Sequence, residues 1–163
     1  MSQTSPDLHA ALRILEVQGW FAERSKATRA RLSAIAKLRT FVKDERIFLA
    51  GDPANGIFGL VSGSLNVSFP RGYGEDYTVH RAVVGFWIGE LALVSGKPRL
   101  VSVRAAEPTV MVHLSAQDLT KLLREDPRLY AVFYALPTRM WGSRSASSAI
   151  SPSLQATSAW PTG

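Results

Sequence analysis

Two segments near the start of the chain have the apolar spacing of amphipathic helices. Their apolar positions are Leu8, Ala11, Leu12 and Leu15, and then Leu32, Ile35, Ala36 and Leu38. Thr28 precedes the second set and is a candidate N-cap. The pattern therefore predicts two or three helices ahead of any sheet.

From Thr40 onward the apolar period shortens to that of strands. The apolar positions are Phe41, Ile47, Leu49, Ile57, Leu60, Leu65 and Val67, and they are separated by Asp52-Pro53, Gly63 and a loop at 70–74. Three runs rich in β-branched residues follow at 77–84, 100–104 and 109–114. Many short strands about ten residues apart predict an antiparallel β-barrel or jelly roll. With its flanking helices the fold class is α+β, mainly β.

Helical signals return at Ser115, which forms a capping pattern with Asp118. A second helix start follows, in which Asp126 caps and Pro127 occupies the first turn. Pro137 would interrupt this helix, and residues 138–163 hold seven serines, two prolines and no acidic residue. We therefore expect one domain over 8–136 and a poorly ordered tail over 137–163 that cannot form a helix-turn-helix.

Composition narrows the possible functions. The 163 residues are 46% hydrophobic and 20% charged. No apolar run approaches the ~20 residues of a membrane span, and the first residues do not resemble a secretion signal, so a cytoplasmic protein without a membrane partner is expected. The chain has no cysteine, which excludes disulfides, thiol catalysis and cysteine-ligated metal clusters. Its histidines, His9, His80 and His113, fall in separate regions, so neither a metal nor another cofactor is expected.

The net charge of +6 is concentrated in one region. Eight of the nineteen basic residues lie between Arg24 and Arg46, against two acidic ones, Asp44 and Glu45. Two interpretations stay open. The cations can form a solvated helix face with their stems on apolar neighbours, or they can contact DNA, an acidic partner or a companion domain.

The segment from Gly85 to Ala92, with Arg99 further on, has the residues of a phosphate-binding cassette. Gly89 lets the backbone approach a ligand, and a short helix starting at Glu90 would direct amide hydrogens at an anion. Arg99 could neutralise that anion, and the Glu90 carboxylate could accept a hydrogen bond from a sugar hydroxyl. Phe86 and Trp87 precede this turn and are either core residues or a stacking surface for a base.

This cassette resembles that of the cyclic nucleotide-binding domain of the Crp/Fnr (catabolite activator) superfamily. The segments 46–54, 56–67, 113–119 and 126–127 also resemble that family, in the same order. The resemblance implies a non-catalytic sensor of cyclic AMP or cyclic GMP that forms a homodimer through its last helix. The site residues that it implies are Gly89, Glu90, Leu91, Ala92, Arg99 and Leu100. Because no helix-turn-helix follows, this chain alone is not expected to bind DNA, although a parent regulator would.

The chain departs from the family at one position of the cassette. Family members usually have a small hydroxyl residue and then alanine after the arginine, where this chain has Leu100 and Val101. The departure leaves two functions open, which are a cyclic nucleotide sensor and a degenerate barrel for dimerisation or protein interaction. A cupin-type enzyme is a third class, but it needs clustered histidines that this chain lacks.

Overall fold

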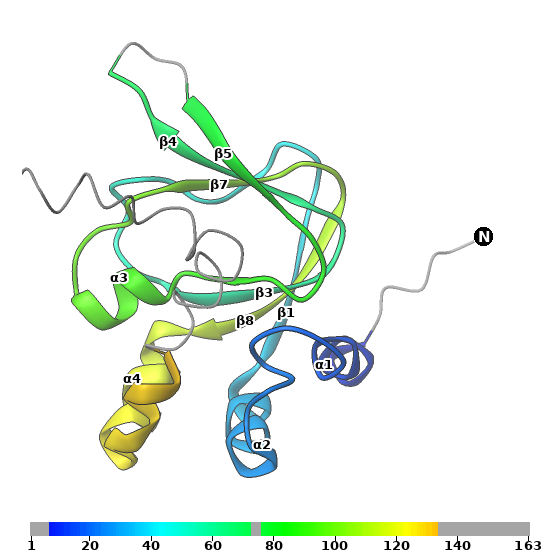
Figure 1. The fold of residues 1–163 in the computed structure, drawn as a ribbon, viewed down its shortest axis with the longest axis vertical. Coiled ribbons are helices and arrows are strands. Elements are labelled where there is room, and N and C mark those ends of the chain that lie inside the picture. Colours follow the sequence, from blue (N-terminus) through cyan, green and yellow to red (C-terminus); the bar gives the residue numbers. More distant parts are fainter. Residues whose placement is uncertain (1–6, 73–75, 134–163) are drawn as a thin grey trace, which may run out of the picture.

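The computed structural model describes residues 7–72 and 76–133 of the chain. Its strands form two four-stranded antiparallel sheets, ordered β1-β8-β3-β6 and β2-β7-β4-β5. The strands are β1 (Lys37–Phe41), β2 (Arg46–Phe48), β3 (Gly56–Ser62), β4 (Leu65–Pro70), β5 (Asp76–Ala82), β6 (Trp87–Ile88), β7 (Ser102–Ala105) and β8 (Thr109–Ser115). Figure 1 shows the two sheets stacked over one another, with the β4–β5 hairpin projecting beyond them. The jelly-roll prediction is confirmed.

Side chains alternate across the first sheet because successive residues of a strand point to opposite faces. On β8, Met111 belongs to the apolar core between the sheets, whereas Val112 and Leu114 belong to a second core. Phe58 on β3 pairs in register with His113 on β8, so both lie on the inner face with Met111. The inner core also takes Phe41, Phe48, Leu60, Leu65, Val67 and Val103.

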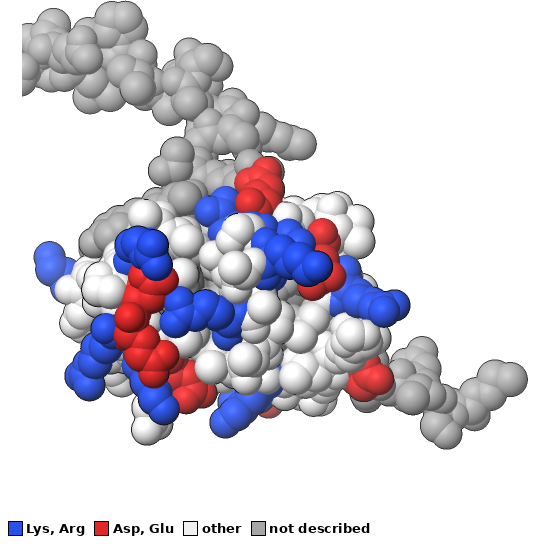
Figure 2. All heavy atoms as spheres, turned by 90° about the horizontal axis from the view of Figure 1, so that it is seen from below, with Lys and Arg blue, Asp and Glu red and all other residues white. Residues whose placement is uncertain are grey.

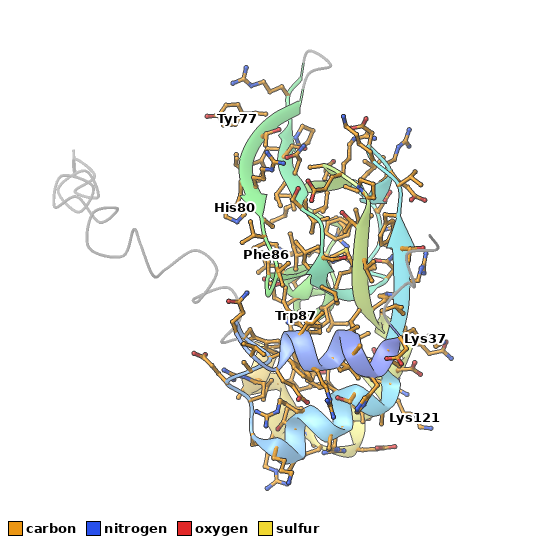
Figure 3. All side chains as sticks on the ribbon, turned by 90° about the vertical axis from the view of Figure 1, so that its right-hand side faces the viewer. Lys37, Tyr77, His80, Phe86, Trp87 and Lys121 are labelled. Carbon is orange, nitrogen blue, oxygen red and sulfur yellow. The ribbon has the colours of Figure 1, made fainter. Side chains whose placement is uncertain are left out.

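The second core lies between the first sheet and the helices. These helices are α1 (Leu8–Leu15), α2 (Lys26–Ile35) and α4 (Ala116–Glu125), and the 3-10 turn η1 (Pro127–Leu129) follows α4. The short helix α3 (Glu90–Ser95) follows β6. Figure 1 shows α1, α2 and α4 gathered below the sheets and α3 at one side. Trp87 is 1% exposed and stacks on Phe21 with ring centroids 5.6 Å apart. Trp87 is therefore a core residue, and Figure 3 shows it between the barrel and the helices.

Several element boundaries differ from the sequence prediction. The N-cap of α2 is Ser25, whose hydroxyl accepts from the Thr28 amide at 3.1 Å, so the Thr28 prediction was wrong. Strand β7 begins at Ser102, which leaves Leu100 and Val101 in the preceding bend. The caps of the last helices are as predicted. The Ser115 hydroxyl accepts from the Asp118 amide at 3.2 Å, and Asp126 accepts from the Arg128 amide at 3.2 Å.

Arginines of the basic segment bind groups within the fold. Arg29 donates to the carbonyls of Ala22 and Arg24, and Arg31 contacts Asp126 at 3.0 Å. Figure 2 views the molecule from below, and on this face acidic side chains are interleaved with the basic ones. The helix-face interpretation can apply only to the cations of α2, because Lys37 and Arg39 lie on β1 and Arg46 lies on β2.

Residues 130–133 are helical and follow η1, and Leu129 and Phe133 are buried in the second core. The predicted interruption at Pro137, the apolar position Leu136 and the tail lie outside the described residues. In the part of the chain that the structure describes, no helix is long and apolar enough to cross a membrane.

Candidate anion-binding pocket

The turn between β6 and α3 lies close to the backbone at the first residue of β3, Gly56. Gly89 caps α3 with a φ of 116°, a left-handed conformation that favours glycine. A Cβ atom at this position would lie 2.6 Å from the Gly56 carbonyl oxygen and 2.8 Å from Nη1 of Arg99. A side chain at Gly89 would thus both strain the backbone and displace Arg99. The helix begins at Glu90, as the cassette predicted.

Arg99 turns inward to this bend. Its Nη1 donates to the Gly89 carbonyl at 2.7 Å. Its Nη2 donates to the Gly56 carbonyl at 2.7 Å and to Oδ1 of Asn55 at 2.6 Å. All three acceptors are uncharged, so the positive charge of the guanidinium is held in place without a direct counter-ion.

The guanidinium is also packed on an aromatic ring. Its Cζ lies 4.0 Å from the centroid of Phe48, within the range of a cation–π contact. The residue is 4% exposed. Burial lowers the pKa of Arg99 to about 10, against the opposing effect of Glu90 and Asp52, so the group is still charged at neutral pH.

Glu90 is the second buried ionisable group of the bend and is 2% exposed. Burial raises the pKa of its carboxyl group, while hydrogen bonds from the backbone at Glu90 and Gly89 and the charge of Arg99 lower it. Although Arg99 acts on this pKa, the two side chains form no direct ion pair among the described contacts. The opposite charges are therefore close enough to interact but remain separate.

Each of these two side chains keeps one polar atom without a partner. They are Oε2 of Glu90 and Nε of Arg99, and both are buried. Leaving a buried polar group unpaired costs about 1–3 kcal/mol, and more for a charged group. Among the described residues the core residue Trp87 has a third such atom, Nε1. Each unpaired buried group calls for an explanation, and a water, an ion or a polar ligand at the bend would supply one for Glu90 and Arg99.

A pocket of about 370 Å³ opens beside the bend. Gly89, Glu90, Ala92 and Arg99 are buried in its wall, whereas Leu91 is 47% and Leu100 is 66% exposed at its rim. The structure thus brings all six residues predicted from the sequence to one pocket. Most of the remaining lining is apolar and includes Phe48, Phe69, Ile88, Pro98 and Val101.

The partners that hold Arg99 were not predicted from the sequence. Asn55 and Gly56 lie at the start of β3, and Gly56 has a φ of 130°. The Asn55 carbonyl also accepts from the Ala116 amide at 3.2 Å and lies 3.0 Å from Nε2 of His113. An Asn-Gly pair before a strand was the available signal, but it indicates a turn and not which distant side chain the turn receives.

The structure places the three histidines apart, and in the ranges 7–72 and 76–133 no group of three or more His, Asp or Glu side chains could hold a metal ion. Arg104 donates to the Asp44 carbonyl at 3.4 Å. Glu90 and Arg99 are the charged side chains buried in the pocket wall, and the exposed Ser95 and Lys97 also line the pocket.

The fold and this pocket define a class of protein, a small β-roll domain with a buried cation and a buried carboxylate in the wall of one pocket. The sequence profile of the family described as cyclic nucleotide-binding domain matches residues 38–126. The match spans more than half of the chain, and the chain belongs to this family. The resemblance inferred from the cassette is confirmed at that level.

Relatives and solved structures agree with this assignment. The chain is 32% identical over 108 residues to a cAMP-dependent protein kinase regulatory subunit of Mycosarcoma maydis, covering 63% of this chain and 20% of that protein. It superposes on a putative cyclic nucleotide-binding protein of Ruegeria pomeroyi with a TM-score of 0.72 at 20% identity, covering 87% of this chain and 63% of the other. The TM-score with the catabolite activator protein of Thermus thermophilus is 0.65 at 23% identity, with coverage of 85% and 62%. The chain spans about a fifth of the length of the kinase subunit.

Proposed function

We propose that the pocket binds a cyclic nucleotide, either cyclic AMP or cyclic GMP. The observation that carries the proposal is the pair of buried unpaired atoms, Oε2 of Glu90 and Nε of Arg99, at one apolar pocket. Arg99 Nε would donate to the cyclic phosphate, and the Glu90 carboxylate would accept from the ribose hydroxyl. The backbone of Gly89, Leu91 and Ala92 would line the phosphate, and the apolar wall would cover the base.

The proposed response to the ligand runs through the start of β3. Asn55 and Gly56 bind Arg99, and the Asn55 carbonyl binds the first amide of α4. A ligand that binds Arg99 and shifts its side chain would therefore also shift α4 and the helical residues after Asp126. Differential binding of this kind shifts a population between two arrangements of the last helix and biases a homodimer or partner contact.

In this proposal the chain is a non-catalytic effector module, cytoplasmic, and part of or derived from a Crp/Fnr-like transcriptional regulator. The likeness to the catabolite activator fold supports that parentage. No binding of DNA by this chain alone is proposed.

The test is a calorimetric titration of the full chain with cyclic AMP and with cyclic GMP. Wild type, Arg99→Ala and Glu90→Gln are compared with Arg81→Ala, which removes an exposed arginine of β5. Loss of binding in the two pocket variants but not in Arg81→Ala supports the proposal. Wild type that gives no heat with either nucleotide up to millimolar concentration removes the nucleotide role.

A second function has an observation of its own. Three apolar side chains at the pocket rim are exposed, Phe69 by 44%, Leu91 by 47% and Leu100 by 66%. Such a rim also suits a degenerate barrel that dimerises or binds a protein without any nucleotide. Sedimentation of the chain without ligand, together with the calorimetric titration, separates the two proposals. A chain that stays monomeric, associates with no partner and binds nucleotide excludes the second function.

A further inference from the structure

His113 belongs to a closed ring of contacts beneath the pocket. Its imidazole stacks on Phe58 at 4.3 Å between centroids with a 7° angle between planes, and Phe58 lies 6.1 Å from Phe48. The guanidinium of Arg99 packs on the ring of Phe48 and donates to the Asn55 side chain. The Asn55 carbonyl returns to His113 at 3.0 Å. The histidine thus contacts Asn55, the polar support of the arginine, directly. It is linked to Phe48, the aromatic support, through Phe58.

The contact with Asn55 fixes which nitrogen carries the proton. A carbonyl oxygen only accepts hydrogen bonds, so Nε2 of His113 must be the donor in the neutral imidazole. A second proton is therefore taken up at Nδ1. The resulting imidazolium would keep the bond to Asn55 and would gain from the face of Phe58.

The charged groups that act on the pKa of His113 are all positive. Lys37 lies opposite it on β1, Arg39 is two residues further along, and Arg99 adds a third cation. The facing strand β3 carries no ionisable side chain, and α1, α2 and α4 cover the other face of the sheet. Burial, opposed by the Asn55 carbonyl, and then these three cations hold the pKa of His113 below its usual value.

We propose that His113 is a positioning residue of the anion pocket, and that its protonation is coupled to anion binding at Arg99. The inference rests on the proposed function, because it assigns a regulation to the same pocket. A bound phosphate offsets the charge of Arg99 and so removes one of the three repulsions that oppose the imidazolium. Proton uptake and anion binding then favour each other, since such coupling is reciprocal.

The pH dependence of anion affinity follows from the lowered pKa of His113. In the free protein His113 is neutral at neutral pH, and the ligand raises the pKa of His113 toward its usual value. Affinity for the anion therefore increases as pH falls from about 7 through the range in which His113 titrates. Glu90 also titrates upward of its usual pKa, so its contribution must be separated by variants that change His113 alone.

The experiment measures the affinity of the full chain for cyclic AMP between about pH 8 and about pH 5. His113→Gln keeps an N–H donor for the Asn55 carbonyl but does not titrate, and Glu90 is unchanged in it. We expect affinity in the wild type to rise about fivefold more over this range than in His113→Gln. His80→Gln is the control, because His80 lies on β5, and Figure 3 shows it on the opposite side of the molecule from Lys37.

A His113→Gln profile that matches the wild type overturns the inference and leaves nucleotide binding intact. Wild type that binds at no pH overturns the proposed function and this inference with it. Should His113→Gln not fold, the ring nitrogens of His113 are followed by NMR in the wild type, with and without saturating cyclic AMP. A pKa of His113 that rises with ligand supports the coupling, and an unchanged pKa refutes it.

Discussion

Replacing Arg99 by alanine removes a side chain that the fold uses even without a ligand. The guanidinium is the donor for the carbonyls of Gly89 and Gly56, both of which are buried, and for the side chain of Asn55, which is exposed. Water can replace the arginine at Asn55 but reaches the two carbonyls less easily. At about 1–3 kcal/mol for each unpaired buried carbonyl, the loss is about 2–6 kcal/mol.

The magnitude is large against a total unfolding free energy of about 5–15 kcal/mol. Releasing the buried charge of Arg99 works in the opposite direction, so we expect the lower half of the range, about 2–4 kcal/mol. Equilibrium unfolding in urea, read by far-UV circular dichroism, gives the value from the midpoint at an unchanged slope.

The matched control is Arg81→Ala. Arg81 is 65% exposed and contacts Glu107 at 4.0 Å, and an exposed pair of this kind contributes less than about 1 kcal/mol. If Arg99→Ala lost no more stability than Arg81→Ala, the reasoning that Arg99 is part of the folded scaffold would be wrong. The comparison also shows why a binding test should not rest on the Arg99 variant alone.

Three further predictions concern other parts of the molecule. Gly59→Ala places a Cβ 2.6 Å from ring carbons of Trp87 and should lower the unfolding free energy by about 1–3 kcal/mol in the same assay, whereas Gly72→Ala, with open space around it, should change it by less than about 0.5 kcal/mol. Ser115→Ala removes the cap of α4 and should cost about 1 kcal/mol, and a thermal midpoint equal to that of the wild type would contradict the capping role. Leu100→Thr supplies a hydroxyl beside Arg99 and should tighten cyclic AMP binding about tenfold by calorimetry; weaker binding would count against a phosphate at this end of the pocket.

The sequence predicted best what depends on neighbours along the chain. The period of the apolar residues placed helices before and after a set of short strands, and the Ser115 cap and the Gly89 turn were located to the residue. The cap of α2 was misplaced because Ser25 and Thr28 are both capping residues and the spacing of the apolar positions does not choose between them.

What the sequence could not predict depends on segments far apart. Asn55 meets Arg99 across 44 positions, and no local pattern couples them. The sequence shows His113 only as an unclustered histidine, because its neighbours come from β1 and β3. Leu100 and Val101 have strand-like composition but lie in a bend, because the chain must turn there to bring Arg99 to Gly89.

The exposed apolar side chains at the pocket rim make the domain suitable for a fluorescence assay. A solvatochromic dye that brightens in apolar surroundings would be expected to lodge among Phe69, Leu91 and Leu100, which are accessible from solvent. A compound that displaces the dye from the pocket would lower the fluorescence, so the fluorescence would report binding of that compound. A chemical library could then be screened against it without assuming in advance what the natural effector is.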